Sequence, residues 1–413
     1  MQIELDDTGS NPEAPHVLPQ AGADSLIRTE FALLRGAYLD VAARGPLPAS
    51  AEAAAARILR AQATGVVAKA EWLSLVETVR GQCAALIGAK PEEVAFTKNT
   101  AEGLNIVGAG LGLAKGDQIV VAPTAEHPNN VFPWLWQAQE KGAEVVSVAP
   151  TPDEPLEDAI IRHVNGRTRL VTVTGVDFGT GRRTDLAAIG SACRAQGAFL
   201  LVDAAQSSGV LKQDMARLPV DGWATAVQKG LLAPYGLGLL YVRNEWAERV
   251  RPVSLARFSV DLKVGHEAAG PEAGWRLREA AGRYEVGNYN YIGLAALQAS
   301  LALLLAIGPE NVEQRSVAAA DQIRAALRRL DIPTLAVPAG HRSHILAIGD
   351  RQEEGHDRSD VVWINALSQA LTRDGVVHSV RRGAVRLSAH VHVLPDMVDR
   401  VIGSLERWRR TDR

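Results

Sequence analysis

Short apolar runs of strand length recur along this chain, separated by longer segments with helical periodicity. The runs lie at residues 94–97, 118–122, 144–148, 170–174, 198–202 and 239–242. A continuous apolar run bounded by turn signals is typical of a strand that is buried on both faces, as in a parallel sheet. Their alternation with helices predicts an α/β fold, in which ligands gather at the carboxyl ends of the strands.

The ends of the chain follow other patterns. Residues 1–23 are rich in Asp, Pro, Gly and Asn without periodicity, and we expect them to form an arm. Capped or Ala-rich helices are predicted at residues 24–34, 49–63 and 71–87. Residues 295–413 contain the helices and strands of a small α+β domain. At 413 residues the chain exceeds one ordinary domain, so a large domain with a smaller companion is expected.

Composition excludes several kinds of partner. The apolar fraction is 47% and the net charge is −3, so neither nucleic acid nor an anionic membrane is expected to bind. The acidic N-terminus lacks an apolar core of signal-peptide length, and the apolar run 301–307 is too short to span a membrane, so we expect a cytoplasmic protein. Cys83 and Cys193 lie in helical patterns that favour buried thiols over a disulfide or a metal site, and no metal is expected.

The chemistry with the clearest signal lies at residues 201–242. Asp203 follows the apolar run 198–202, at the carboxyl end of a predicted buried strand, and Lys229 follows about one helix and one strand later. Pyridoxal phosphate requires an amine for a Schiff base and a carboxylate that keeps its pyridine nitrogen protonated. Asp203 and Lys229 can supply both, and the Gln206 amide can donate to the ring oxygen. The alternative is a helix-capping Asp and a surface Lys.

The same residues resemble a known family. Residues 202–206, Val-Asp-Ala-Ala-Gln, and residues 228–238, Gln-Lys-Gly-Leu-Leu-Ala-Pro-Tyr-Gly-Leu-Gly, resemble the "VDAxQ … HKWLLGPxGxG" pattern of class V aminotransferase-fold enzymes. The resemblance implies a fold type I pyridoxal-phosphate enzyme with Lys229, Asp203 and His127 as its catalytic residues. It also implies a large domain with a mostly parallel seven-stranded sheet in an αβα sandwich, and a smaller α+β domain built from both termini. The corresponding division is residues 1–23, an arm; 24–64, small domain; 65–294, large cofactor-binding domain; and 295–413, small domain.

Weaker motifs extend the resemblance to residues 36–410. In residues 98–105, which follow the "strand, Asn-Thr, helix" pattern, Thr100 and Ala101 would hold the cofactor phosphate, although an ordinary helix cap has the same pattern. His127, in a segment similar to "EHxxNxxPW", would stack on the pyridine ring. Asn288 takes the place of the Thr in "RFExGT", which reaches the phosphate of the partner subunit, and this implies an obligate homodimer.

The substrate side has its own motifs. Residues 38–48 resemble "YLDxAAxGPxP", which would place Ala43 and Arg44 beside the substrate, although a simple turn is the alternative for Arg44. Residues 386–390 match "R-[IL]-S-x-H", so Arg386 would clamp the substrate α-carboxylate with two parallel hydrogen bonds. Arg381 and Arg382 are competing candidates, and solvated edge charges are the alternative for both.

Besides Asn288, the chain departs from the family at residues 226, 228 and 177–178. Ala226 and Gln228 stand where many relatives have Ser and His, which removes one phosphate contact and leaves Gln228 as a substitute donor. Asp177 and Phe178 stand where many relatives carry an Asn that touches the ring oxygen, so that contact stays unassigned.

The position of the cysteines limits which reaction the chain can catalyse. Residues 376–390 contain no cysteine, so persulfide-forming desulfuration is not expected. The chain is predicted to act on an amino acid or amino-acid conjugate through an external aldimine, as an aminotransferase or as a C–S lyase working by β-elimination. An epimerase of the isopenicillin N epimerase type is one alternative. A non-catalytic scaffold that retains the fold is the alternative of another class.

Overall fold

The computed structural model describes residues 17–66, 69–151, 154–263, 274–350, 352 and 355–411. Residues 1–16 of the expected arm lie outside this range. The first described helix, α1 (Gln20–Glu30), begins and ends four residues earlier than predicted. Asp24, the first residue of the predicted capped helix, lies inside α1 and pairs with Arg315 at 2.5 Å. A tertiary ion pair, rather than a helix cap, therefore uses its carboxylate.

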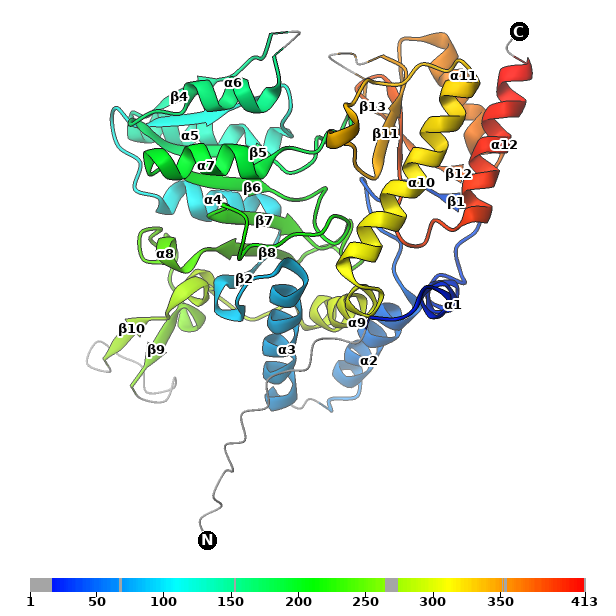
Figure 1. Ribbon diagram of the computed structural model, residues 1–413. Coiled ribbons are helices and arrows are strands. Elements are labelled where there is room, and N and C mark those ends of the chain that lie inside the picture. Colours follow the sequence, from blue (N-terminus) through cyan, green and yellow to red (C-terminus); the bar gives the residue numbers. More distant parts are fainter. Residues whose placement is uncertain are drawn as a thin grey trace.

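A seven-stranded sheet forms the centre of the large domain (Figure 1). The strand order is β2-β8-β7-β6-β5-β3-β4, and only β8 runs antiparallel to its neighbours. The strands are β2 (Val94–Thr97), β3 (Gln118–Val121), β4 (Glu144–Ser147), β5 (Thr168–Thr174), β6 (Phe199–Asp203), β7 (Gly222–Ala226) and β8 (Gly238–Val242). The predicted mostly parallel seven-stranded sheet is therefore confirmed.

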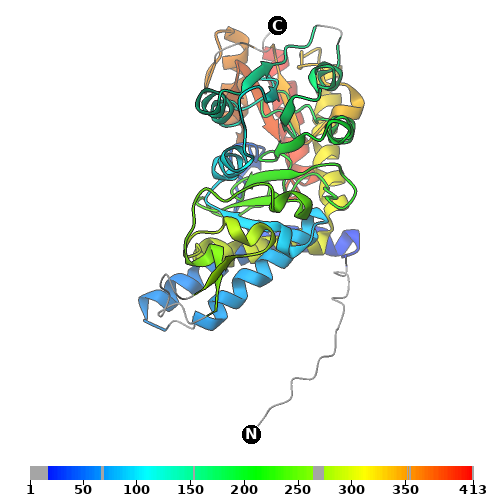
Figure 2. The ribbon, with the colours of Figure 1, turned by 90° about the vertical axis from the view of Figure 1, so that its left-hand side faces the viewer.

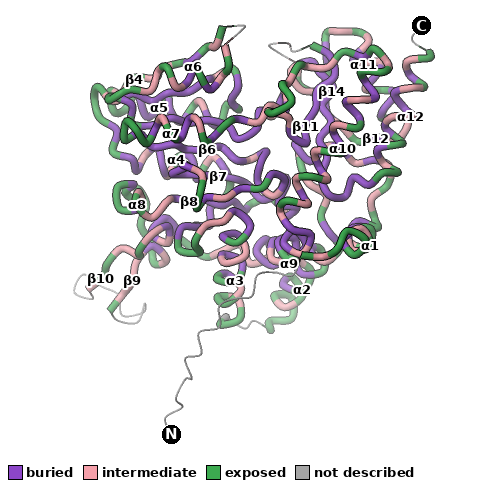
Figure 3. Tube along the Cα trace, viewed as in Figure 1, coloured by how far each residue is buried: buried purple, intermediate pink, exposed green. Residues whose placement is uncertain are grey.

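Helices cover both faces of this sheet because its strands are apolar on both faces. In β6, Phe199 and Leu201 pack into the core cluster on the side of α4 (Thr100–Gly110) and α5 (Phe132–Lys141). Leu200 and Val202 pack into the cluster on the opposite side. That cluster also contains residues of α3 (Lys69–Ile87), α6 (Leu156–His163), α7 (Leu186–Gln196) and α9 (Tyr291–Ile307). Figure 3 shows the central strands β6, β7 and β8 buried, whereas the surrounding helices carry exposed residues.

No helix forms between β6 and β7, contrary to the helix expected between Asp203 and Lys229. Residues 204–221, all of which are described, make turns instead. The Ser208 hydroxyl donates to Ala204 O at 2.7 Å, and Gly209 adopts a positive φ of 73°. A Cβ on Gly209 would lie 2.3 Å from Gly230 O, so this turn packs directly on the loop that carries Lys229.

The small domain joins the two ends of the chain. Strand β1 (Ala37–Tyr38) pairs in parallel with β12 (Val376–Val377), beside the antiparallel sheet β11-β14-β13. The other elements are β11 (Ile345–Ile348), β13 (Ser379–Arg381), β14 (Ala384–Ser388), α10 (Pro309–Arg329), α11 (Val362–Arg373) and α12 (Pro395–Thr411). Helix α2 (Ala49–Ala63), predicted at these bounds, packs on α9 and extends with α3 away from the sheet (Figure 2).

The proposed domain boundary at residues 294–295 falls inside α9, whose residues belong to the large-domain core cluster. The division into domains therefore stays a prediction. A short helix, α8 (Asn244–Ala247), and a hairpin of β9 (Val260–Leu262) and β10 (Trp275–Leu277) extend the large domain beyond β8. Among the described helices, none is by itself long and apolar enough to cross a membrane; α9 and α10 reach that length and composition only together, across a bend of 83°.

Candidate active site

Two adjoining cavities open at the carboxyl ends of β5, β6 and β7. The inner cavity measures about 380 Å³ and the outer one about 550 Å³. They share the lining residues His127, Phe178, Gln206, Lys229 and Tyr235. The inner cavity also contains Asp203 and the first turn of α4, and the outer one is lined by arginines of the small domain. The site thus lies at the strand edge that the sequence predicts, between the two domains.

Lys229 lies at the boundary of the two cavities, on the loop after β7. Burial lowers the pKa of its amine to about 8; the Asp203 carboxylate opposes this, and Arg386 and Arg381 add to it. A neutral, nucleophilic form of this amine is therefore accessible near neutral pH.

The loop that carries Lys229 is held from two directions. The Gly45 N–H donates to Gln228 O at 2.8 Å, and His390 Nε2 donates to Gly230 O at 2.9 Å. His390 is fully buried, and burial lowers its pKa to about 4, so it is a neutral imidazole with its proton on Nε2. The sequence motif contains His390, but this positioning role was missed because the contact spans 160 residues.

Asp203 is the last residue of β6, as predicted, and it is 5% exposed. Its Oδ1 accepts a hydrogen bond from Ala205 N at 3.0 Å. Burial raises the pKa of this carboxyl, and the Ala205 N–H and the Lys229 charge partly offset that effect. A buried carboxylate with one backbone donor is well suited to a cationic partner, because an unpaired buried charge is costly.

Gln206 shows that the inner cavity is shaped for a polar ligand. Its Nε2 donates to Ala42 O at 3.0 Å, and its Oε1 is buried without a partner among the described residues. Buried amide atoms normally have partners, so an orphaned one at a cavity wall fits a bound group that completes it. The second N–H of the amide stays available for the predicted contact with the ring oxygen.

The first turn of α4 forms the anion-binding end of the inner cavity. Asn99 caps the helix through its side chain, which accepts from Glu102 N at 2.9 Å. Thr100 and Ala101 occupy the first helical positions and line the cavity, where backbone N–H groups lack intrahelical partners. A Cβ on Gly238 would lie 2.8 Å from Asn99 Cα, so β8 supports this turn at backbone contact. The arrangement fits a phosphate.

His127 and Phe178 form the aromatic wall. The two ring centroids lie 5.3 Å apart at an interplanar angle of 71°, and His127 Nδ1 accepts from Asn129 N at 3.2 Å. Burial, and then the Lys229 charge, lowers the pKa of His127, which favours the neutral ring. A neutral imidazole at the cavity wall can lie against a flat heterocycle, as the resemblance implies.

A buried polar network holds the loop that carries His127. Glu126 Oε1 accepts from Thr174 N at 2.7 Å, and Glu126 Oε2 accepts from Asn130 Nδ2 at 2.7 Å. Asn130 in turn accepts from the Trp134 indole and from the Thr172 hydroxyl. Glu126, Asn130 and Trp134 belong to the sequence motif, which gave them no role, and their contacts now identify them as support for the loop of His127.

Arg386 and Ala43 line the outer cavity as predicted for the substrate side, whereas Arg44 is exposed and outside both linings. Arg386 is 2% exposed, and it donates to Phe178 O at 2.9 Å, to Asp40 Oδ1 at 3.3 Å and to Ser379 Oγ at 3.2 Å. One N–H on each terminal nitrogen is left over, which is what a bidentate carboxylate pair requires. Arg381 and Arg382 also line this cavity, although solvated edge charges were an open alternative for both.

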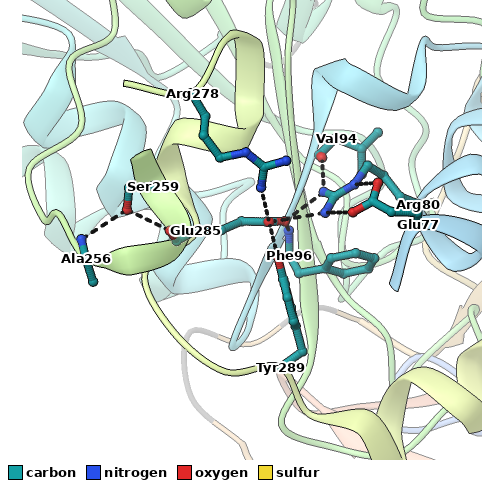
Figure 4. Close-up of polar contacts among 9 residues, drawn as sticks. All are labelled: Glu77, Arg80, Val94, Phe96, Ala256, Ser259, Arg278, Glu285 and Tyr289. Carbon is teal, nitrogen blue, oxygen red and sulfur yellow. Dashed lines mark hydrogen bonds and ion pairs between the residues drawn. The ribbon is translucent and has the colours of Figure 1, made fainter. Parts of the chain in front are cut away.

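Asn288 lies outside the linings of both cavities. It is exposed and lines a separate hollow with Lys98, Glu102 and Gly236. The preceding Glu285 is anchored tightly: its carboxylate accepts from Arg80 at 2.7 Å, from Phe96 N at 2.8 Å and from the Tyr289 hydroxyl at 2.6 Å (Figure 4). The Ser259 hydroxyl donates to Glu285 O at 2.7 Å. A rigid base therefore presents Asn288 at the surface.

Taken together, the amine, the buried carboxylate, the phosphate-binding helix end, the aromatic wall and the remaining N–H of the Gln206 amide fit pyridoxal phosphate. The family described as aminotransferase class-V matches residues 37–377. A probable cysteine desulfurase of Methanothermobacter thermautotrophicus is 32% identical over 312 residues, which cover 74% of this chain and 76% of the relative. A cysteine desulfurase of Klebsiella pneumoniae subsp. pneumoniae is 27% identical over 387 residues, covering 90% and 93% of the two chains.

Solved structures share the fold. A cysteine desulfurase from Thermococcus onnurineus superposes with a TM-score of 0.79 at 24% identity, covering 94% of this chain and 98% of the other. A cystine C–S lyase does so with a TM-score of 0.79 at 23% identity, covering 91% and 98%. With the family match over most of its length, the chain belongs to the class V aminotransferases and is a pyridoxal-phosphate-dependent enzyme that acts on an amino acid.

Proposed function

We propose that this enzyme is a C–S lyase that breaks the Cβ–S bond of a sulfur-bearing amino acid. The sulfur, with any substituent that it carries, is released as a free product. Relatives named as cysteine desulfurases support sulfur chemistry. The observation that carries the proposal is the place of the two cysteines. Cys83 and Cys193 lie buried in α3 and α7, and burial raises the pKa of each thiol to about 12. Neither can receive sulfur as a thiolate at the site.

The alternatives are weaker. The relatives reported above are named as desulfurases, so the epimerase alternative is not favoured. The non-catalytic scaffold is excluded by the class V assignment, which makes the chain an enzyme. Transamination remains the competing reaction because it uses the same residues in its first steps. We also propose a cytoplasmic location, which the free state of both cysteines supports.

The inner cavity would hold the cofactor through residues of several elements. Lys229 would bind it covalently, Asp203 would hold the ring nitrogen protonated, and Thr100 and Ala101 would bind the phosphate. His127 would lie against the ring, with Gln206 and Gln228 as amide contacts at its edge. When bound, pyridoxal phosphate supplies an electron sink for the pair left behind when the substrate Cα loses a proton.

Lys229 and Arg386 would carry out proton transfer and substrate binding. Lys229 Nζ would take the Cα proton of the substrate, and its lowered pKa matches that role. The Cα–H and Cβ–S bonds break, a Cα–Cβ double bond forms, and the sulfur leaves with the bonding electrons. Arg386 clamps the α-carboxylate and thereby fixes which bond at Cα meets the lysine.

The product assay tests the proposed reaction. The holoenzyme is mixed with cysteine, cystine and S-substituted cysteines without an oxo-acid acceptor. A lyase is expected to release pyruvate and ammonia continuously, in equal amounts, because each turnover regenerates the starting enzyme. A burst of one amino group per site, with lasting loss of the visible absorbance band, would show an aminotransferase and overturn the C–S lyase proposal.

Replacing Arg386 tests the carboxylate clamp. Arg386→Ala is expected to lower kcat/KM because a buried charged pair with the substrate is lost. The loss corresponds to an activation free energy higher by about 2–5 kcal/mol. Arg386→Lys is the matched variant, because it keeps the charge but loses the pair of parallel N–H donors. Its kcat/KM is expected to lie between those of the wild type and Arg386→Ala. Circular dichroism of both variants checks that Asp40, left without its partner, has not unfolded the small domain. Wild-type kcat/KM in folded Arg386→Ala would place the carboxylate elsewhere.

We also propose a homodimer in which Asn288 reaches the phosphate of the other subunit. Three apolar side chains of α5, adjacent to the site loop, are exposed: Phe132 by 66%, Leu135 by 46% and Trp136 by 55%. An exposed apolar patch of this kind supports a covering partner. Tyr235, which lines both cavities, is itself 63% exposed, so the site is open on one side.

Complementation tests this assembly. Lys229→Ala subunits are mixed and refolded with Asn288→Ala subunits at equal concentration, and activity is measured at limiting cofactor. Random pairing makes about half of the dimers hybrids, and one site in each hybrid combines Lys229 with the partner's Asn288. About a quarter of all sites are therefore expected to be intact. Absence of any gain over the unmixed variants, with hybrids present, would refute a shared site.

A further inference from the structure

We propose that the preferred substrate carries a second anionic group at the end of its side chain, bound by Arg381 and Arg382. This inference rests on the proposed function and specifies the substrate of that same site. The outer cavity is lined by three guanidinium groups, those of Arg381, Arg382 and Arg386. A plain α-amino acid brings only one carboxylate, and Arg386 accounts for it.

Among the described residues, Arg382 is the arginine of the outer cavity that has no carboxylate partner. None of the described carboxylates lies within ion-pair distance of it, whereas Arg386 pairs with Asp40 at 3.3 Å and Arg381 pairs with Asp357 at 2.6 Å. The nearby Asp177 is engaged in its own turn, where its Oδ1 accepts from Gly179 N at 2.7 Å. A guanidinium at a partly enclosed cavity wall is stabilised by an anionic ligand.

The Arg382 guanidinium is held in place before any ligand binds. It lies over the Phe178 ring with its Cζ 4.7 Å from the ring centroid, and it donates to Thr124 O at 2.8 Å and to Glu126 O at 3.3 Å. Its backbone has a φ of 48°, in the left-handed region that non-glycine residues seldom adopt. Such strain persists where surrounding structure enforces it, and it is concentrated at functional sites.

Arg381 is available to share the anion. Its partner Asp357 is 70% exposed, and such a surface pair contributes little and exchanges readily for a better-placed ligand. Arg381 itself is mostly buried, with a side chain 18% exposed, and its charge acts on both Lys229 and Arg386. His356 also lines the cavity, with its Nδ1 2.9 Å from Asp357 Oδ2.

The geometry therefore divides the substrate between two sets of cations. Arg386, deep in the cavity, binds the α-carboxylate beside Lys229, and Arg381 and Arg382 bind the distal anion. For a lyase, this distal anion lies on the sulfur-bearing leaving group. Specificity then follows from electrostatics, because a neutral side chain leaves the Arg382 charge without a counter-ion.

Two substrates that differ by one charge test this inference. S-carboxymethylcysteine and S-carbamoylmethylcysteine have the same scissile bond and nearly the same shape, but only the first has a distal carboxylate. We expect wild-type kcat/KM to favour S-carboxymethylcysteine by about tenfold to a hundredfold, and Arg382→Gln to remove most of that preference. Arg382→Lys, which keeps the charge, is expected to retain part of it.

Arg358→Gln is the matched control, because Arg358 is exposed and lies outside the cavity lining. Its substitution removes the same net charge as Arg382→Gln. It is expected to keep the wild-type preference. Equal wild-type rates on the two substrates would overturn the inference while leaving the C–S lyase proposal intact. Activity on neither substrate, nor on cysteine or cystine, would instead contradict the lyase proposal itself. The wild-type comparison decides the matter even where a variant folds poorly.

Discussion

Lys229→Ala is expected to lower turnover by about 100- to 10,000-fold or more, because one amine is both the covalent attachment point and the proton carrier. The fold should persist, since the lysine ends in a cavity and its loop is held by Gly45, Gly209 and His390 rather than by its own side chain. Steady-state kinetics and the absorbance spectrum of the purified variant measure both effects.

Lys98→Ala is the matched control, since Lys98 and Lys229 are the two lysines that line the inner cavity. This control should keep the visible band that a lysine-bound cofactor gives, and Lys229→Ala should lose it. Persistence of the band in Lys229→Ala together with its loss in Lys98→Ala would reassign the cofactor lysine.

Asp203→Asn is expected to retain the cofactor but lower kcat by about 100-fold or more. An amide has nearly the same shape as the carboxyl group, so the hydrogen bond to Ala205 N can persist. It cannot carry the negative charge that keeps the ring nitrogen protonated. The cofactor would then be a weaker electron acceptor, and the loss should appear in kcat rather than in KM.

Asp221→Asn separates this effect from a general loss of buried charge. Asp221 is also a buried carboxylate, just before β7, where its Oδ2 accepts from Leu200 N at 3.0 Å, but it lies outside the linings of the two cavities. The control is expected to lower Tm and leave kcat close to wild type. Near-normal kcat in Asp203→Asn would reduce Asp203 to a structural residue.

The features that could be predicted are those encoded in local pattern. The apolar run 198–202 led directly to β6 and to the position of Asp203 at its end. The Ala-rich segment led to α2 at its observed bounds, because a long run of strong helix formers between turn residues leaves few alternatives.

The features that were missed depend on contacts between distant residues. The turn between β6 and β7 replaces a helix because Gly209 packs against Gly230. His390 reaches the lysine loop across 160 residues, and Arg382 reaches Thr124 across 258. No local pattern distinguishes an arginine in a hairpin turn that enters a cavity from one that faces solvent, so Arg381 and Arg382 had to be placed by the fold.

The most direct test of the account is the covalent position of the cofactor. Borohydride treatment of the holoenzyme fixes the lysine-bound cofactor, and peptide mass spectrometry then locates the added group. We expect the modification on the peptide that contains Lys229, at close to one per subunit, and none on the peptide that contains Lys98. A single modified lysine elsewhere in the chain, with Lys229 unmodified, would contradict the central claim.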